Sequence, residues 1–312
     1  MPSRSKREPN LLRDELLIRM SLNFRSWVTK FRAMKKTFKS AEIVSTAEGR
    51  QYHIGLAPGD VAPYILMCGD PARARRVAKY FEKARPEITS REYVTITGKY
   101  KGMPITVMAT GMGPDNTEIA VVELSQIVAN PTFIRIGSSS AFKKEIELAE
   151  VVVSTGAVRL ENTSTAFVVE GYPAVAHHEV VLALLQAAKE KGFPYRVGLT
   201  ATAPGFYGAQ ARNVPGFPPR YPELCADLER MNVTNFEMET SCLFTLATLA
   251  NHRAGAVCAV YGNRHKNVFI DSETKDLAER RCLETGLHAF EILAKMDGAK
   301  GSEKYWIPSM GM

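Results

Sequence analysis

The segment Gly-Asp-Pro-Ala-Arg at 69–73 is the first of several places where the residue types could bind a charged ligand. An apolar run at 64–68 precedes it, Asp70 suits a helix cap, and Pro71 suits the first helical position. Free N–H groups at a helix N-terminus, together with an arginine fork, suit a phosphate group. The segment therefore predicts an anion site, and the alternative is a capped helix whose Arg73 faces solvent.

Arg135 lies within the apolar run Phe-Ile-Arg-Ile at 133–136, and Gly-Ser-Ser-Ser at 137–140 follows directly. An unpaired charge inside an apolar strand would cost several kcal/mol. Arg135 therefore requires an anionic partner. We interpret the arginine and the hydroxyls as a second anion site, or as the second half of the first. The alternative is a buried arginine–carboxylate pair.

Two further segments carry groups that could bind a polar organic molecule. Asn-Phe-Glu-Met-Glu-Thr at 235–240 places Glu237 and Glu239 where a strand meets a helix. Carboxylates there either complement the helix dipole or accept two hydrogen bonds from a diol. Gly-Phe-Tyr-Gly-Ala-Gln-Ala-Arg at 205–212 offers an amide and a guanidinium that match the imide edge of a pyrimidine. The alternative for this segment is a polar surface loop.

The elements that must position these residues alternate between strands and helices. Apolar runs predict strands at 64–68, 93–97, 105–110, 133–136, 151–158, 197–201 and 255–261, and helical spacing predicts helices at 72–81, 116–128, 178–191, 239–251 and 272–295. This alternation predicts a single α/β domain of three layers, with a mixed, largely parallel central sheet flanked by helices. Ligands of such sheets lie beyond the carboxyl ends of the strands, which is where the four segments lie.

We expect three regions: an N-terminal extension at 1–50, the domain at 51–296 and a loose tail at 297–312. The formal charge of +7 resides in the extension, which holds twelve Lys/Arg and five Asp/Glu, so the remainder is balanced. Large apolar residues at 16–38 recur at three- or four-residue steps among lysines and arginines, which predicts a basic amphipathic helix. We expect it to pack on the body or on a neighbouring subunit. The alternatives are a targeting segment and contact of residues 16–39 with an anionic membrane surface. No nucleic-acid partner is expected.

The five cysteines are widely spaced and form no C-x-x-C pair, so we expect reduced thiols and a cytoplasmic protein. No apolar run is long enough to span a membrane.

Seven motifs carry a resemblance to a known family. They are H-x-G-L at 53–56, GDPAR at 69–73, SREY at 90–93, TGMG at 110–113, RIGSS at 135–139, F-Y-x-x-Q-x-R at 206–212 and FEMET at 236–240. Their order and spacing resemble the trimeric-to-hexameric nucleoside phosphorylases, and within that family the bacterial-type uridine phosphorylases. The resemblance runs from about residue 52 to 295. It implies a pentosyltransferase of pyrimidine salvage that converts uridine and phosphate into uracil and ribose 1-phosphate.

The resemblance also implies a role for each matching position. Phosphate would be held by Gly69, Arg73, Arg135 and Ser138, with Arg91 reaching in from a neighbouring subunit. Ribose would be held by Met238 and Glu239, with the neighbour's His53 on the 5′-hydroxyl. The base would be held by Phe206, Gln210, Arg212 and Arg264. Among these, Arg212, Gln210, Glu239 and Arg135 would be the catalytic set.

The implied reaction is a direct attack of phosphate on C1′, with Arg212 and Gln210 stabilising the departing base. Phosphate is then a co-substrate and no organic cofactor is expected. Members of the family often hold a monovalent cation such as K⁺ at a subunit interface, and Glu92, Met112 and Asn116 are the matching positions. The family also implies a homo-oligomer, a dimer at least and up to a hexamer.

The choice of base depends on Tyr-Gly-Asn-Arg at 261–264, which lacks the Ser-Asp pair of the purine-acting relatives and so favours pyrimidine. Two positions depart from the family pattern: Ser140 stands for a glycine, and Tyr261-Gly262 stand for an aliphatic pair near C5 of the base. The alternatives are a purine or methylthioadenosine phosphorylase, a hydrolytic nucleosidase, and a non-catalytic protein that binds through its basic extension.

Overall fold

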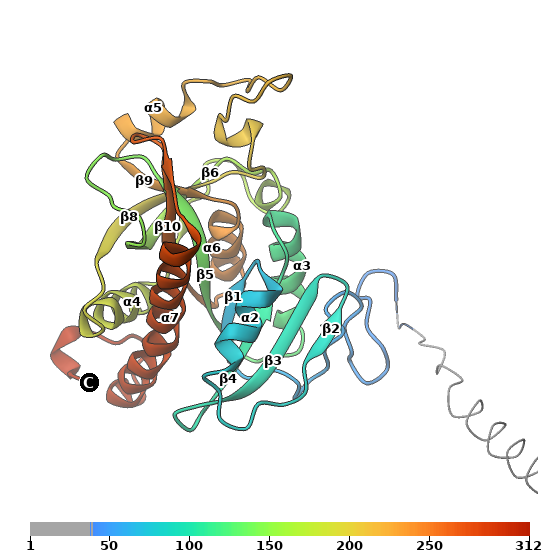
Figure 1. The fold of residues 1–312 in the computed structure, drawn as a ribbon. Helices are drawn as coiled ribbons and strands as arrows, with labels where there is room; N and C mark the ends of the chain where they lie inside the picture. The colour runs from blue at the N-terminus through green and yellow to red at the C-terminus, as the bar shows by residue number, and fades with distance from the viewer. Residues whose placement is uncertain (1–37, 39) are drawn as a thin grey trace, which may run out of the picture. The chain divides into compact units, whose positions relative to one another are not determined.

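The computed structural model describes residue 38 and residues 40–312. The chain divides at Ala47 into two units, and residues 48–312 form the α/β domain (Figure 1). The amphipathic helix predicted at 16–38 lies, apart from Phe38, outside the described residues. Among the described residues, no helix is both long and apolar enough to cross a membrane.

One mixed sheet organises the domain. Its strands are β1 (Tyr64–Cys68), β2 (Ile88–Ser90), β3 (Tyr93–Tyr100), β4 (Met103–Ala109), β5 (Thr132–Ala141), β6 (Val151–Arg159), β7 (Ala174–Val175), β8 (Tyr195–Thr202), β9 (Val233–Glu237), β10 (Arg253–Asn263) and β11 (Val268–Phe269). The strand order is β11-β10-β6-β8-β9-β5-β1-β4-β3-β2, and β10 also pairs with β5. That extra pairing closes β5, β10, β6, β8 and β9 into a ring, from which β1 to β4 extend as an open sheet. The centre, from β4 through β1 and β5 to β10, is parallel.

Helices cover both faces of this sheet. They are α2 (Pro71–Ala78), α3 (Pro114–Ser125), α4 (His178–Glu190), α5 (Leu224–Arg230), α6 (Thr240–Leu249) and α7 (Ser272–Lys300). Alternate residues of β1 face opposite ways, because side chains along a strand alternate. Leu66 and Cys68 pack with α2, α4 and α7, whereas Ile65 and Met67 pack with α3 and α6. The predicted three-layer α/β fold with a mixed sheet is therefore confirmed.

Short or fully buried elements are the ones that the periodicity of the sequence did not predict. β9 is buried at every position, including polar Thr234 and Asn235, so it lacks the alternation of a half-exposed strand. The Asn235 side-chain oxygen accepts a hydrogen bond from Thr200 at 2.8 Å, whereas the buried Nδ2 atom of Asn235 has no hydrogen-bond partner among the described residues. β7 and β11 have two residues each, too few to show a period.

The C-terminal segment is mostly exposed after α7 and is anchored at Trp306. α7 continues to Lys300, past the expected end of the domain at 296. Trp306 is buried, and its backbone N–H donates to Glu179 at 2.9 Å. The division into three regions, with a loose tail at 297–312, stays a prediction.

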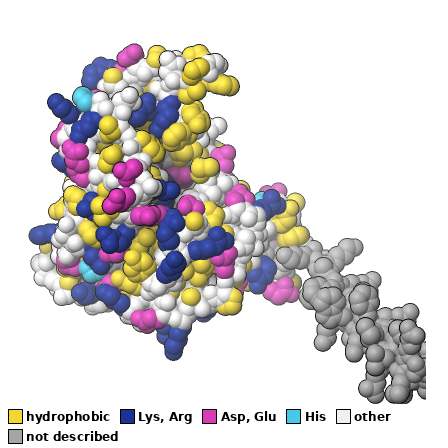
Figure 2. Space-filling view, in the orientation of Figure 1, with side chains coloured by type: hydrophobic (Ala, Val, Ile, Leu, Met, Phe, Trp, Pro, Cys, Tyr) yellow, Lys and Arg dark blue, Asp and Glu magenta, His cyan; other side chains and the backbone are white. Residues whose placement is uncertain are grey.

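On the face shown in Figure 2, the Lys and Arg side chains of the described residues are interleaved with Asp and Glu. No broad area of one sign covers that face.

Candidate active site

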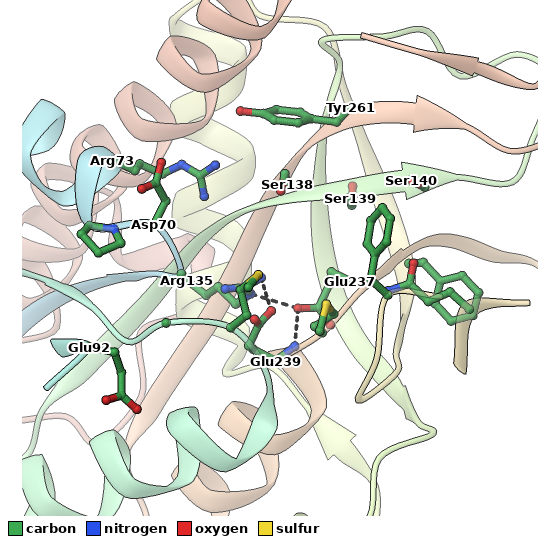
Figure 3. Close-up of a pocket in the computed structure, with 18 of the residues that line it drawn as sticks. Asp70, Arg73, Glu92, Arg135, Ser138, Ser139, Ser140, Glu237, Glu239 and Tyr261 are labelled. Atoms are coloured by element: carbon green, nitrogen blue, oxygen red, sulfur yellow. Dashed lines mark hydrogen bonds and ion pairs between the residues drawn. The ribbon is translucent and has the colours of Figure 1, made fainter. Parts of the chain in front are cut away.

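A cavity of about 550 Å³ opens where β1, β5, β9 and β10 bring their functional residues together (Figure 3). The predicted binding residues that line it are Gly69, Arg73, Arg135, Ser138, Phe206, Gln210, Met238 and Glu239. Two of the expected cation positions, Glu92 and Met112, also line it. The four segments singled out in the sequence therefore meet in one place.

Arg73 lies in the first turn of α2 with its side chain buried. Its Nε donates to Glu279 of α7 at 2.6 Å, and one terminal nitrogen lies 3.4 Å from the Ile136 carbonyl oxygen. Burial opposes the charged form, but the neighbouring Cys68, Tyr261 and Glu279 raise the pKa of Arg73 above its ordinary value. The helix cap is present, since Asp70 accepts from the Ala72 N–H at 2.8 Å. Arg73 itself does not face solvent.

Arg135 is buried between two carboxylates, as Figure 3 shows. Its Nε donates to Glu237 at 2.9 Å, and a terminal nitrogen forms an ion pair with Glu239. Burial disfavours the charge, and the two carboxylates outweigh that effect and raise the pKa of Arg135. The anionic partner that the sequence required is thus supplied within the chain, and the arginine still reaches the cavity.

The two carboxylates differ in what they hold. Glu237 accepts hydrogen bonds from Thr202 at 2.5 Å and from the backbone N–H groups of Glu239 and Thr240, so it fixes the turn into α6. Glu239 accepts from the Gly113 N–H at 2.8 Å and lines the cavity. Burial raises the pKa of Glu239, against the attraction of Arg135. Both carboxylates line the cavity, but Glu237 is engaged with the turn into α6, and Glu239 has fewer hydrogen-bond partners and is the better candidate to bind a ligand.

Three hydroxyls run along β5 beside these ion pairs. Ser138, Ser139 and Ser140 all line the cavity, and Figure 3 shows them in a row between Tyr261 and Glu237. Ser139 Oγ donates to the Ala259 carbonyl at 3.3 Å. Ser140 lies toward the aromatic end of the cavity, 3.4 Å from a terminal nitrogen of Arg212.

At the aromatic end, Phe206, Gln210 and Arg212 form one assembly. The Arg212 guanidinium stacks on the Phe206 ring at 3.7 Å and donates to the Gln210 side-chain oxygen at 2.6 Å. Arg264 donates to the carbonyl oxygens of Gln210 and Ala211 at 2.8 and 3.2 Å. Neither Arg212 nor Arg264, both predicted at the base, is among the residues that line the cavity. Burial and the charge of Arg264 lower the pKa of Arg212 to about 10, which leaves it charged at neutral pH.

His53 and Arg91 do not line this cavity. The Nδ1 atom of His53 is 2.6 Å from Glu123, which also accepts from the Ile54 N–H at 2.9 Å. The Arg91 guanidinium lies 5.1 Å from the centre of the Tyr52 ring. A single chain therefore does not bring these two residues to the cavity, as expected for groups that serve a neighbour.

Only two of the three positions expected to bind a cation line the cavity. Glu92 and Met112 line the cavity, whereas Asn116 Nδ2 lies 3.5 Å from the Met112 carbonyl oxygen. Among the described residues, no cluster of three or more His, Cys, Asp or Glu has the arrangement of a metal site.

Several residues of the cavity were not assigned a role from the sequence. Tyr261 and Phe269 line it, and Glu279 anchors Arg73 from outside it. Burial raises the pKa of the Tyr261 phenol to about 12, so it stays protonated. The position of Phe269 could not be predicted from the sequence, because Phe269 follows a turn, and turns do not show the hydrophobic periodicity of helices and strands. Glu279 lies on a helix full of charged residues and gives no sign of its buried position.

Comparison with known proteins agrees with this geometry. Residues 63–289 match the model of the phosphorylase superfamily. The chain is 44% identical over 283 residues to the uridine phosphorylase of Thermococcus kodakarensis, covering 89% of this chain and 99% of that protein. It is 36% identical over 247 residues to the uridine phosphorylase of Haemophilus influenzae, covering 78% of this chain and 98% of that protein. A solved structure of uridine phosphorylase from Vibrio fischeri, in complex with 6-hydroxy-1-naphthoic acid, superposes with a TM-score of 0.70 at 27% identity, over 79% of this chain and 97% of that one.

Proposed function

Because the chain belongs to the phosphorylase superfamily, we propose that it exchanges inorganic phosphate for the uracil of uridine, giving ribose 1-phosphate and free uracil. One observation of the structure carries the proposal. A single cavity holds two buried arginines and a row of hydroxyls at one end, and Gln210 with Phe206 at the other. Glu239 lies in the same cavity. These are the groups that a phosphate, a base and a sugar diol require.

Phosphate would bind at the end formed by Gly69, Arg73, Arg135 and Ser138. Each of the two guanidiniums uses its Nε to donate to a carboxylate, Glu279 or Glu237. A guanidinium carries five N–H donors, so anchoring through Nε leaves donors for a bound anion. The arginines would thus be held in place before phosphate arrives, which limits the entropy lost on binding.

Glu239 would accept the 2′- and 3′-hydroxyls of the ribose, with Met238 packed against the sugar. Phosphate would then attack C1′ as the bond to the base breaks, leaving positive charge on the sugar and negative charge on the base. The phosphate anion would lie beside the sugar, and Arg212 with Gln210 would stabilise the departing pyrimidine anion. Holding both reactants in one cavity converts a bimolecular step into a unimolecular one. No covalent intermediate with the protein is needed.

A second copy of the chain would complete the site with His53 and Arg91. Neither His53 nor Arg91 lines the cavity of its own chain, and this supports a role for them in the site of a neighbouring copy. A monovalent cation near Glu92, Met112 and Asn116, and a cytoplasmic location, belong to the same proposal.

The test is product formation by the purified protein. Uridine with phosphate should give uracil, seen as a change in ultraviolet absorbance, and ribose 1-phosphate in equal amount. Thymidine, inosine and adenosine serve as competing substrates. Release of base without phosphate would indicate a hydrolase, and preference for inosine or adenosine would indicate a purine phosphorylase; either result would overturn the proposal.

A further inference from the structure

Ser140 and Gly262, which belong to the two departures from the family pattern, lie side by side on neighbouring strands, and Ser140 lines the cavity. They are register partners on the parallel strands β5 and β10. A Cβ atom added at Gly262 would lie 3.0 Å from Ser140 Oγ and 3.1 Å from the Phe269 ring. Contacts this short force a neighbour to move. The hydroxyl of Ser140 and the ring of Phe269 thus occupy space that a side chain at 262 would need.

A bulge in β10 creates this arrangement. The register with β5 shifts between Val260 and Gly262, so Tyr261 is the extra residue. Tyr261 packs into the core beside α7, and Gly262 is left facing Ser140. The wall that the family pattern makes aliphatic is therefore hydroxyl-bearing in this chain.

Ser140 is also tied to the residue expected to act on the leaving base. A terminal nitrogen of Arg212 lies 3.4 Å from Ser140 Oγ and donates to it. A serine hydroxyl has one proton to give and two lone pairs. When the oxygen accepts from Arg212, its own proton stays free for a partner in the cavity. Donation by a guanidinium also polarises the hydroxyl and makes that proton a better donor.

We propose that Ser140 is a specificity-determining residue for the base: its hydroxyl, which occupies space that a side chain at 262 would need, accepts from Arg212 and donates to a pyrimidine carbonyl oxygen. The inference rests on the proposed function. The proton is donated and not transferred, so no bond in the protein changes. As the glycosidic bond breaks, negative charge grows on the carbonyl oxygen and the hydrogen bond strengthens. The hydroxyl would therefore favour a base with a carbonyl at that point over one with an amino group, as in cytidine.

The phosphate end offers Ser140 no comparable role. Ser138 is the hydroxyl nearest Arg135 along the strand, and Ser139 is engaged with the Ala259 carbonyl. Ser140 is the hydroxyl within hydrogen-bonding reach of Arg212. A substitution at 140 should thus alter the kinetics for the nucleoside and leave the KM for phosphate within about twofold.

The first experiment removes the hydroxyl and varies the carbonyl. Ser140→Ala should lower kcat/KM for uridine by about tenfold to a hundredfold, the range for a hydrogen bond to a charged group. 2-Thiouridine and 4-thiouridine each replace one carbonyl oxygen of the base by sulfur, which is a poor hydrogen-bond acceptor. With the analogue altered at the oxygen that Ser140 contacts, the loss of kcat/KM caused by Ser140→Ala should fall below about threefold. An analogue that is not cleaved is assayed by its inhibition constant. Ser139→Ala is the matched control, and any effect it has should be equal for all three nucleosides.

Equal penalties of Ser140→Ala on uridine and both thio analogues would mean a packing role and would overturn the inference. So would wild-type kinetics in that variant, while the proposed function would stand. A wild-type protein that does not cleave uridine would overturn the proposed function and the base contact together.

The second experiment tests the shared space without using activity. Gly262→Ala should lower Tm by about 2–4 °C through its contacts with Ser140 and Phe269. In a Ser140→Gly background the same change should cost about half as much, because one of the two contacts is gone. Equal losses of Tm in the two backgrounds would show that the residues at 140 and 262 do not compete for space, and would overturn that part of the inference.

Discussion

Arg212→Ala tests whether the aromatic end of the cavity stabilises the leaving base. The change removes a guanidinium that stacks on Phe206 at 3.7 Å and donates to Gln210 at 2.6 Å. Arg264 would keep its hydrogen bonds to the carbonyls of Gln210 and Ala211, so the loop should keep its backbone conformation. The variant therefore removes one charge while leaving the backbone support in place.

The expected loss follows from where that charge lies. Losing one hydrogen-bond donor to a developing anion in an active site costs about 3–4 kcal/mol, or 10²–10³ in turnover. A solvent-exposed ion pair would contribute about 0–1 kcal/mol, less than a factor of about five. Arg212 is half-buried, and burial lowers its pKa to about 10 while leaving it charged. We therefore expect a loss of about 10²–10³ in kcat, with little change in the KM for phosphate.

The assay compares uridine with 5-fluorouridine. The fluorinated base leaves as a more stable anion and needs less help, so the penalty of Arg212→Ala should be smaller with it. Arg230→Ala, on an exposed arginine of α5, is the matched control and should leave both rates unchanged. A variant within a factor of about five of wild type, or one with the same penalty for both substrates, would refute the assignment of Arg212 to the leaving group.

Three further outcomes follow from the structure. Mixing inactive Arg91→Ala with inactive Arg212→Ala subunits should restore part of the activity; no recovery despite proven subunit exchange would show that each site is built from one chain. Deleting residues 1–45 should leave phosphorolysis within about threefold, since the site residues begin after them; loss of activity in a folded variant of unchanged oligomeric state would contradict this. Burial opposes ionisation of Asp297, but Arg253 lowers its pKa to about 2, below the unfolded value, so its stabilisation is present above about pH 4 and is lost as pH falls through 2. Asp297→Asn should therefore lower Tm at pH 7 by about 2 °C and have no effect near pH 2, as thermal unfolding at the two pH values would show.

The sequence predicted the long elements well because their signals are local. β1 was predicted at its observed bounds, because the residues that make its apolar run, and those of the capped helix start after it, lie next to one another in the chain. The same locality explains why the strand-end segments could be singled out as candidate ligand-binding segments. Fully buried β9 and the short β7 and β11 carry no such local pattern, and they appear only when the neighbouring strands are in place.

The carboxylates that hold the arginines could not be predicted from local patterns. Glu279 is 206 residues from Arg73, and Glu237 is 102 residues from Arg135. Periodicity gives Glu279 no distinction from the other charged residues of its helix. Only the packing of α7 against α2 and β5 brings its carboxylate under Arg73. For Arg135 the sequence left two interpretations open, an anion site and a buried pair.

The buried pair is observed for Arg135, and it is compatible with the proposed anion site for a reason that is general for buried anion sites. A guanidinium without a partner in the protein would cost several kcal/mol of stability. A carboxylate at its Nε side removes that cost, and the same contact fixes the rotamer so that the remaining donors point to a set position. Arg73 with Glu279 repeats the arrangement at the same end of the cavity. A buried arginine–carboxylate pair at a strand end is thus no argument against ligand binding there, because the pair is what allows the arginine to be present and oriented.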